Sequence, residues 1–181
     1  MPYDSFKHHR RSIRLKGYDY SQPGPYFVTI CAQNRECVFG EITNNKMVLT
    51  HLGDLVSKWW LDIPNHFPTV RIDKWIVMPN HLHGIIIIET NRRGEVPSPS
   101  PSPSPSPKLG NVIAYFKYQS TKEINQKRNV SGVPLWQRNY YEHIIRDDND
   151  LNRIRKYIED NPQNWANDEN HLVNTKPRGP K

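Results

Sequence analysis

An uninterrupted alternation of proline and serine from Pro97 to Pro107 constrains the fold of this 181-residue chain more than any other feature. Every second residue of the run lacks an amide donor, so neither a helix nor a strand ladder can include it. At about 3.1 Å per residue, an extended polyproline-like spacer would reach roughly 30 Å. The residues that follow do not look able to fold alone, so we interpret the run as a surface loop inside one domain.

The sequence on the two sides of the spacer has the same order of elements: strand, helix and strand. Periodicity and turn signals predict a strand at 26–32, a hairpin at 37–42 and 46–49, a helix at 52–63, strands at 72–78 and 81–89, a helix from 109, a strand at 135–145 and a helix over 147–161. Two β-α-β halves are typical of a ferredoxin-like α+β sandwich, an antiparallel sheet with helices on one face. The early hairpin is an extra N-terminal feature, and the fold by itself names no function.

The composition excludes several classes of protein. Five Trp and nine Tyr are too many for a solvated tail, and no stretch has the roughly 20 apolar residues that span a bilayer. Cys31 and Cys37 cannot by themselves form a disulfide framework or a four-ligand zinc site. The N-terminus lacks the apolar core of a secretory signal, which favours a cytoplasmic protein. We expect a single domain over 1–181, with a basic segment at 1–20 and a polar tail at 167–181 that frays.

An excess of basic side chains favours a polyanion as the partner. Lys and Arg number 25 against 18 Asp and Glu, a formal charge of +7, and such an excess binds phosphates through counterion release. A merely soluble basic protein, or a disordered basic tail, would show the same excess. The N-terminal segment combines basic groups with aromatic rings that could stack on bases, namely Arg10, Arg11, Arg14, Lys16, Tyr18 and Tyr20.

Two histidines begin the strand that is expected after the turn at residues 79–80. Residues i and i+2 of a strand point to the same side, so His81 and His83 present two imidazoles side by side. Such a pair is ready to bind a metal. The alternative is that each histidine is a hydrogen-bonded polar residue near a strand end. The strand continues to Ile88 with apolar residues on both faces, which favours a metal because a buried polar start is costly unless it is used.

The last predicted helix offers groups that could complete such a site. Tyr157 and Asn161 are four residues apart and are therefore neighbours on one helical face. An Asn carbonyl can bind a metal, and a Tyr hydroxyl one turn away would lie close to a substrate held on that metal. Taken alone, Tyr157 is more typical of an amphipathic core residue than of a nucleophile, and Tyr141 competes with it for the catalytic role.

Several runs of the chain resemble one family, the REP-associated tyrosine transposases of the single-tyrosine HUH superfamily. The run Trp75–Gly84 is similar to the His-hydrophobic-His signature of that superfamily, and the other matching runs are Arg11–Tyr20, Trp136–Arg146 and Arg155–Pro162. The similarity covers roughly residues 10 to 166 and fails only across the Pro/Ser run. It implies a ferredoxin-like catalytic fold that cuts single-stranded DNA at palindromic repeat hairpins.

The resemblance also implies roles for individual residues. His81 and His83 match the metal-binding histidines, Asn161 matches the third ligand, and Tyr157 matches the nucleophile that forms a 5′-phosphotyrosine link. The metal would be Mg²⁺ or Mn²⁺, since two His and one Asn leave room for either. The partner would be single-stranded DNA with hairpin-forming repeats, bound by a monomer or a homodimer. Further candidate DNA contacts are Lys117, Arg138, Tyr140, Tyr141 and Arg155.

Three other functions are compatible with the same residues. A replication initiator or relaxase shares the paired histidines but usually has a longer chain or a helicase domain. A non-catalytic protein could keep the fold and bind DNA hairpins. A metal hydrolase of small substrates would leave the basic N-terminus unexplained.

Overall fold

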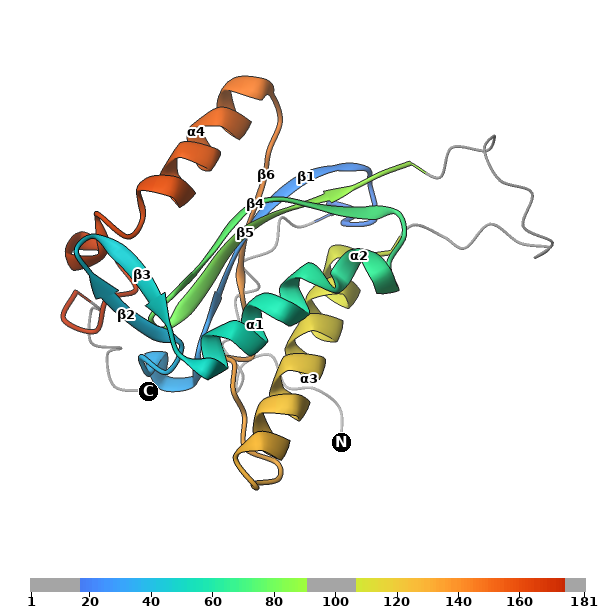
Figure 1. The fold of residues 1–181 in the computed structure, drawn as a ribbon. Coiled ribbons are helices and arrows are strands. Elements are labelled where there is room, and N and C mark those ends of the chain that lie inside the picture. The colour runs from blue at the N-terminus through green and yellow to red at the C-terminus, as the bar shows by residue number, and fades with distance from the viewer. Residues whose placement is uncertain (1–16, 91–106, 175–181) are drawn as a thin grey trace, which may run out of the picture.

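The computed structural model describes residues 17–90 and 107–174, which form a four-stranded antiparallel sheet with helices on both of its faces (Figure 1). The strands, in their order across the sheet, are β4 (Val70–Met78), β5 (His81–Ile88), β1 (Gly24–Cys31) and β6 (Tyr141–Ile144). This order, in a chain that runs β-α-β-β-α-β, is that of the ferredoxin-like sandwich, so the predicted fold class is confirmed. The basic residues Arg10, Arg11, Arg14 and Lys16 and the Pro/Ser run before Pro107 lie outside the described residues.

The main core lies on the face of the sheet that α1 (His51–Leu61) and α3 (Leu109–Lys127) cover. Alternate residues of the central strands, such as Val28 and Ile86, point to this face and pack against Trp60 of α1. Thr50 caps α1 by accepting a hydrogen bond from the backbone N–H of Gly53. The predicted helix at 52–63 is interrupted at residue 62, and a short helix, α2 (Ile63–His66), follows with a proline in its first turn, where proline is tolerated.

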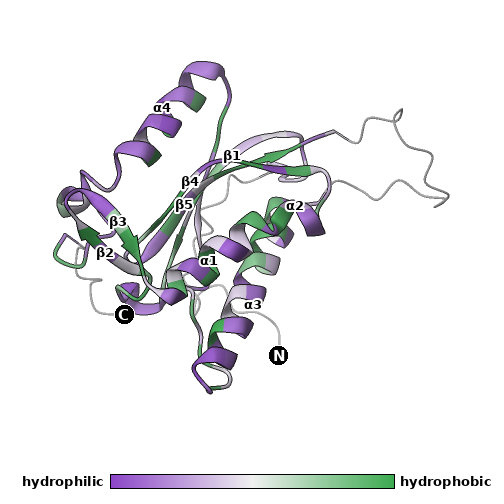
Figure 2. Ribbon diagram, viewed as in Figure 1, coloured by the Kyte–Doolittle hydropathy of each residue, from purple (hydrophilic) through white to green (hydrophobic). Residues whose placement is uncertain are grey.

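The last helix, α4 (Asp148–Asp160), packs on the opposite face of the sheet (Figure 1). Its apolar residues Ile154 and Ile158 meet Phe27 and Ile85 in a second, smaller core. Most of α4 is hydrophilic, whereas the strands beneath it are largely hydrophobic (Figure 2). The prediction of helices on one face therefore holds for α1 and α3 but not for α4.

Two predictions about the β structure have different outcomes. The predicted hairpin forms a separate two-stranded sheet of β2 (Gly40–Thr43) and β3 (Lys46–Leu49). The strand predicted at 135–145 is much shorter, because only β6 pairs with β1 and Trp136 makes an isolated bridge to Ala32. Between Trp136 and β6, Lys117 Nζ donates hydrogen bonds to the carbonyl oxygens of residues 137 and 139, at 2.9 and 3.1 Å. In the described part of the chain, none of the helices has the length and apolarity that a membrane span requires.

Candidate metal and nucleophile site

The two histidines lie at the buried start of β5, on the face of the sheet that α4 covers. His81 and His83 are 0% and 1% exposed. Because β5 is hydrogen-bonded to β4 on one side and to β1 on the other, both imidazoles lie over the interior of the sheet. Thr29 of β1 is the register partner of His83, and its Oγ1 lies 2.8 Å from His83 Nδ1. The neighbouring strand thus fixes the position of the His83 ring.

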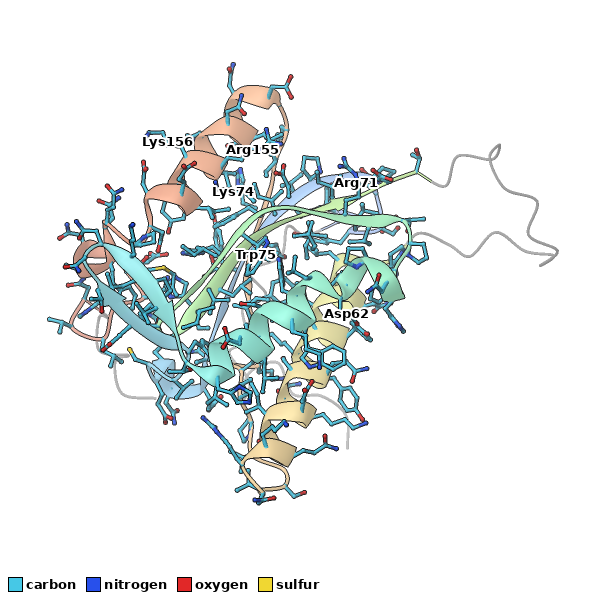
Figure 3. The ribbon with its side chains drawn as sticks, viewed as in Figure 1. Asp62, Arg71, Lys74, Trp75, Arg155 and Lys156 are labelled. Atoms are coloured by element: carbon cyan, nitrogen blue, oxygen red, sulfur yellow. The ribbon has the colours of Figure 1, made fainter. Side chains whose placement is uncertain are left out.

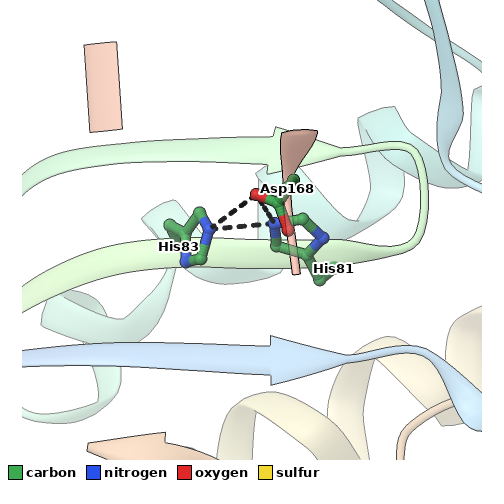
Figure 4. Close-up of side chains that lie close together, drawn as sticks. All are labelled: His81, His83 and Asp168. Carbon is green, nitrogen blue, oxygen red and sulfur yellow. Dashed lines mark hydrogen bonds and ion pairs between the residues drawn. The ribbon is translucent and has the colours of Figure 1, made fainter. Parts of the chain in front are cut away.

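The two imidazoles face each other through their Nε2 atoms, which are 2.9 Å apart. A carboxylate completes this arrangement, since Asp168 Oδ2 lies 3.9 Å from His81 Nε2 and 4.0 Å from His83 Nε2 (Figure 4). Among the residues that the structure describes, this is the one group of three or more His, Cys, Asp or Glu ligand atoms close enough together to hold an ion.

Burial determines the charge of these groups. It lowers the pKa of His81 well below the ordinary value of 6.5, and the neighbouring His83 lowers it further. Burial also lowers the pKa of His83, although Asp168 acts in the opposite direction. For Asp168, burial favours the neutral acid, but the two histidines and the backbone N–H of Asn170, which donates at 2.6 Å, hold the pKa of the carboxyl well below its usual range. The site therefore offers neutral imidazoles and a carboxylate, the protonation states that bind metals.

Tyr157 brings a hydroxyl to the same site from α4. Its Oη lies 3.3 Å from His83 Nε2, and its ring packs edge-on against Phe27 with the centroids 6.0 Å apart. The side chain is 42% exposed, so a substrate can reach it. Burial and the charge of Asp168 raise the pKa of Tyr157 to about 12, while hydrogen bonding to Asn161 acts in the opposite direction. Without a cation, the phenol is therefore protonated at neutral pH.

Asn161, the predicted third metal ligand, lies one turn after Tyr157 at the C-cap of α4 and is 2% exposed. Its Oδ1 atom is buried and has no hydrogen-bond partner within the described part of the chain. Leaving such an oxygen unsatisfied costs roughly 1–3 kcal/mol. A cation is one partner that would satisfy it, so Asn161 stays a candidate ligand beside Asp168.

Asp168 was missed because it lies in the segment that the sequence predicts to be a fraying tail. Asp168 and Asn170 are 8% and 4% exposed, and they follow a short 3₁₀ turn at Trp165–Asn167. Asn80 Nδ2 donates a hydrogen bond to the carbonyl oxygen of Asn170 at 2.9 Å. Asp168 and Asn170 are therefore held against the site, whereas Leu172 and Val173 further along the predicted tail are exposed. Nothing local in the sequence distinguishes Asp168 from the other acidic residues, since its position depends on contacts with residues far away in the chain.

Ion pairs tie α4 to the edge strand β4. Arg155 Nε and Nη2 lie 3.0 and 2.5 Å from Asp73 Oδ2, and Lys74 Nζ lies 3.2 Å from Glu159 Oε2. Asp73 and Lys74 occupy an irregularity in the pairing of β4 with β5. In Figure 3, both Arg155 and Lys74 lie between the helix and the sheet. Arg155, a candidate DNA contact, is thus engaged within the protein two residues before Tyr157.

Other candidate DNA contacts lie on the surface near β6. Tyr141 is 52% exposed, and its ring contacts Phe27, which also contacts Tyr157. Arg138 is exposed in the segment that precedes β6. These two residues have the exposure that contact with DNA requires.

The remaining candidates are engaged in packing. Lys117 Nζ lies 5.4 Å from the centre of the Tyr140 ring in addition to its carbonyl contacts, and burial lowers the pKa of Lys117 to about 8. Tyr18 and Tyr20 are partly buried and pack on Tyr26, with ring centroids at 6.4 and 6.1 Å. These side chains support the fold on the face of the sheet that α1 and α3 cover.

The residues at the site fit a divalent cation. Two imidazole lone pairs that face each other at 2.9 Å repel unless a proton or a cation lies between them. Imidazole nitrogens suit Mn²⁺ better than Mg²⁺, whereas the oxygens of Asp168 and Asn161 suit both ions. His81 and His83, with one or both of these oxygen donors, could therefore hold such an ion.

Comparisons with known proteins found relatives in sequence and in fold. The chain is 44% identical over 174 residues to an uncharacterized protein of Haemophilus influenzae, covering 92% of this chain and 96% of that one. It is 29% identical over 156 residues to a Haemophilus influenzae protein described as a "putative REP-associated tyrosine transposase", covering 80% of this chain and 73% of that one. A solved structure of a REP-associated tyrosine transposase bound to a REP hairpin has a TM-score of 0.57 and 18% identity, covering 84% of this chain and 73% of that chain. No family model matches the chain.

The fold and the site together define a class of ferredoxin-like proteins in which paired strand histidines face a tyrosine on the last helix. At 18% identity, the solved structure supports the fold alone, and the sequence relative at 29% identity carries the same description. The chain is thus similar in sequence and in fold to the REP-associated tyrosine transposases. This relationship indicates a transposase-like function.

Proposed function

We propose that this protein is a metal-dependent endonuclease and strand transferase that cuts single-stranded DNA at palindromic repeat hairpins. The observation that carries the proposal is the 3.3 Å distance between Tyr157 Oη and His83 Nε2, which brings the candidate nucleophile to the candidate metal ligands within one chain. The related solved structure is bound to a REP hairpin, which supports hairpin DNA as the substrate class.

The chemistry follows from the groups of this chain. His81 and His83 would hold the cation together with Asp168 or Asn161. When bound, the cation supplies a Lewis acid that polarises the scissile phosphate and offsets the charge that develops on it. The Tyr157 hydroxyl attacks phosphorus, and the bond from phosphorus to the 3′ oxygen breaks. The phosphate then joins the Tyr157 oxygen to the 5′ oxygen of the cut strand.

The protons can be exchanged with solvent, because the Tyr157 side chain is partly exposed. The phenol loses its proton to water, and the leaving 3′ oxygen takes one up. The phosphotyrosine bond retains the energy of the broken ester, so the 3′-hydroxyl of a second strand can be joined without a nucleotide cofactor. Covalent storage of this kind is what a strand transferase needs.

We assign the DNA contacts by exposure and charge. Tyr141 offers a ring beside Tyr157 on which a base could stack, and Arg138 offers an exposed cation for a phosphate. The N-terminal residues Arg10, Arg11, Arg14 and Lys16 would add phosphate contacts. Five residues would act indirectly, by supporting the surfaces that carry these groups: Tyr18, Tyr20, Lys117, Tyr140 and Arg155.

A covalent trapping assay tests the proposal. Wild-type protein should form a denaturant-resistant adduct with a single-stranded hairpin oligonucleotide in Mn²⁺, and Tyr157→Phe should form none. Tyr118→Phe is a matched control, because Tyr118 is 62% exposed on α3 on the other face of the sheet. An adduct that persists in Tyr157→Phe would remove Tyr157 from the role of nucleophile.

The same assay separates the proposal from the non-catalytic alternative. The raised pKa of Tyr157, about 12, is the observation that favours a protein which only binds hairpins. Such a protein would bind the oligonucleotide equally well with Mn²⁺ or with EDTA and would form no adduct in either. Adduct formation that depends on Mn²⁺ would exclude it.

A further inference from the structure

Asn80 lies in the turn between β4 and β5 and is completely buried. Its Nδ2 atom donates two hydrogen bonds, to the carbonyl oxygen of Arg35 at 3.0 Å and to that of Asn170 at 2.9 Å. A side-chain amide nitrogen carries two protons, so both of its donors are used. The orientation of the amide is therefore fixed, and its Oδ1 atom faces His81 Nδ1 at 2.8 Å.

This orientation determines which nitrogen of His81 carries the proton. An amide oxygen can only accept a hydrogen bond, so His81 Nδ1 must donate. An imidazole that binds a metal carries one proton, and with that proton on Nδ1 the lone pair lies on Nε2. His81 Nε2 is the atom that faces His83 Nε2 and Asp168.

We propose that Asn80 is a positioning residue that holds His81 in the Nδ1–H tautomer and thereby makes His81 Nε2 a metal ligand. The proposal rests on the metal site of the proposed function, and it adds a residue that acts through a ligand without touching the metal. Hydrogen-bond partners of this kind typically change metal affinity by about 10- to 100-fold when they are removed.

The backbone segment that accepts a hydrogen bond from Asn80 has an unusual conformation. Asn34 and Arg35 both have positive φ angles, of 54° and 58°, a left-handed conformation that Asn tolerates but that is unfavourable for Arg. In this conformation the carbonyl of Arg35 is presented to Asn80, and Arg35 Nη1 donates a hydrogen bond to the carbonyl of Glu169 at 2.9 Å. Local strain of this kind is maintained only where the surrounding structure fixes it.

The second anchor of Asn80 connects the amide to Asp168. The backbone N–H of Asn170 donates to Asp168 Oδ1, while the carbonyl of Asn170 accepts from Asn80. One buried amide therefore joins the turn at residues 33–35, the start of β5 and the segment that carries the carboxylate. By contrast, His83 Nδ1 faces the hydroxyl of Thr29, which can either donate or accept, so its tautomer is not fixed in this way.

The experiment begins with wild-type protein in EDTA, in which ¹⁵N NMR of the histidine side chains reports the tautomer. The proposal expects His81 to carry its proton on Nδ1, and a proton on Nε2 would overturn it. This measurement requires neither metal nor DNA, so its result is independent of whether Tyr157 is the nucleophile. The covalent trapping assay tests that role separately.

Two variants of Asn80 then separate positioning from a structural role. Asn80→Leu removes every hydrogen bond of the amide, whereas Asn80→Asp keeps an acceptor for His81 Nδ1 and loses the two donated bonds. We expect calorimetric affinity for Mn²⁺ to fall about 10- to 100-fold in Asn80→Leu and by less than about threefold in Asn80→Asp. Asn125→Leu is the matched control, because Asn125 is 9% exposed on α3 and donates to the carbonyl of Val133 at 2.9 Å.

The outcomes are distinct. Asn125→Leu should lower the free energy of unfolding and leave the affinity for Mn²⁺ unchanged. If Asn80→Leu binds Mn²⁺ as wild type does, or if Asn80→Asp loses as much affinity as Asn80→Leu, then the acceptor on His81 has no special role and the proposal fails.

Discussion

Replacing Gly84 with alanine tests whether the contact between β5 and α1 fixes the position of the site. A Cβ atom at Gly84 would lie 2.3 Å from Trp60 Cζ2, 2.9 Å from Cε2 and 3.1 Å from Cη2. Ordinary van der Waals contact lies at 3.4–4 Å, so the strand and the ring would have to separate by about 1 Å. Gly84 directly follows His83, whose side chain points to the other face of the same strand.

The size of the effect follows from how tightly Trp60 is packed. The residue is 0% exposed, and its ring meets Phe116 edge-on with the centroids 5.2 Å apart. Overpacking of a dense core costs about 1–3 kcal/mol. Because the new methyl group would meet three atoms of a ring that cannot retreat, we expect Gly84→Ala to lower the free energy of unfolding by about 3 kcal/mol, the upper end of that range.

Urea denaturation followed by circular dichroism measures this change. For a slope of about 2 kcal/mol per molar urea, the midpoint should fall by about 1.5 M with the slope unchanged. Affinity for Mn²⁺ should also fall, since a displaced β5 moves His83 relative to Asp168. The second variant is Trp60→Leu, which removes the ring atoms that the new methyl group would meet.

A double-mutant cycle then tests the stated cause. Gly84→Ala combined with Trp60→Leu should be less destabilised than the sum of the two single changes, with a coupling energy of about 1–3 kcal/mol. A wild-type midpoint for Gly84→Ala, or strict additivity of the two changes, would refute the argument that this contact holds the strand in place.

Three further outcomes follow from the site. Asp168→Asn should weaken Mn²⁺ binding at least about tenfold in calorimetry, because an amide oxygen replaces the charged ligand; unchanged affinity would remove Asp168 from the ligand set. Asp73→Asn should change the free energy of unfolding by less than about 1 kcal/mol, since the pair with Arg155 is partly exposed, yet it should slow adduct formation without changing hairpin affinity; a change in affinity alone would return Arg155 to DNA binding. In EDTA, burial lowers the pKa of both His81 and His83 below 6.5. Below that pH the unfolded chain therefore binds more protons than the folded chain. The free energy of unfolding should then fall by up to about 3 kcal/mol for each unit by which the pH is lowered. Urea titrations between pH 7 and pH 5 measure this slope, which should shrink in the double variant His81→Gln/His83→Gln.

The parts of the structure that were predictable from the sequence are those that local rules determine. Alternation along β5 correctly placed His81 and His83 on one side of the strand, and Asp147 marked the start of α4, where it accepts a hydrogen bond from the backbone N–H of Asp150. The two βαβ halves predicted the ferredoxin-like fold class. Each of these inferences depends on residues that are close together in the chain.

The parts that were not predictable depend on contacts between distant segments. The early end of pairing in the strand predicted at 135–145 could not be read from the sequence, because the carbonyl groups between Trp136 and β6 bind Lys117, a side chain of α3. The face of the sheet on which α4 packs could not be predicted either. The strand β5 is apolar on both faces, so its pattern allows a helix on either one.

The site combines a rigid part, the two histidines of β5, with a less firmly held part, Tyr157 of α4. His81 and His83 stand on a central strand that is hydrogen-bonded on both sides, and Asn80 fixes the ring of the first. Tyr157 stands on a helix whose fully buried apolar residues are only Ile154 and Ile158, with Leu151 partly buried beside them, and ion pairs join the helix to the edge of the sheet. A helix with few buried apolar contacts can open locally at lower free energy than the sheet beneath it. Loss of the tyrosine from the site therefore requires only the movement of α4, while the metal ligands of β5 stay where the sheet holds them.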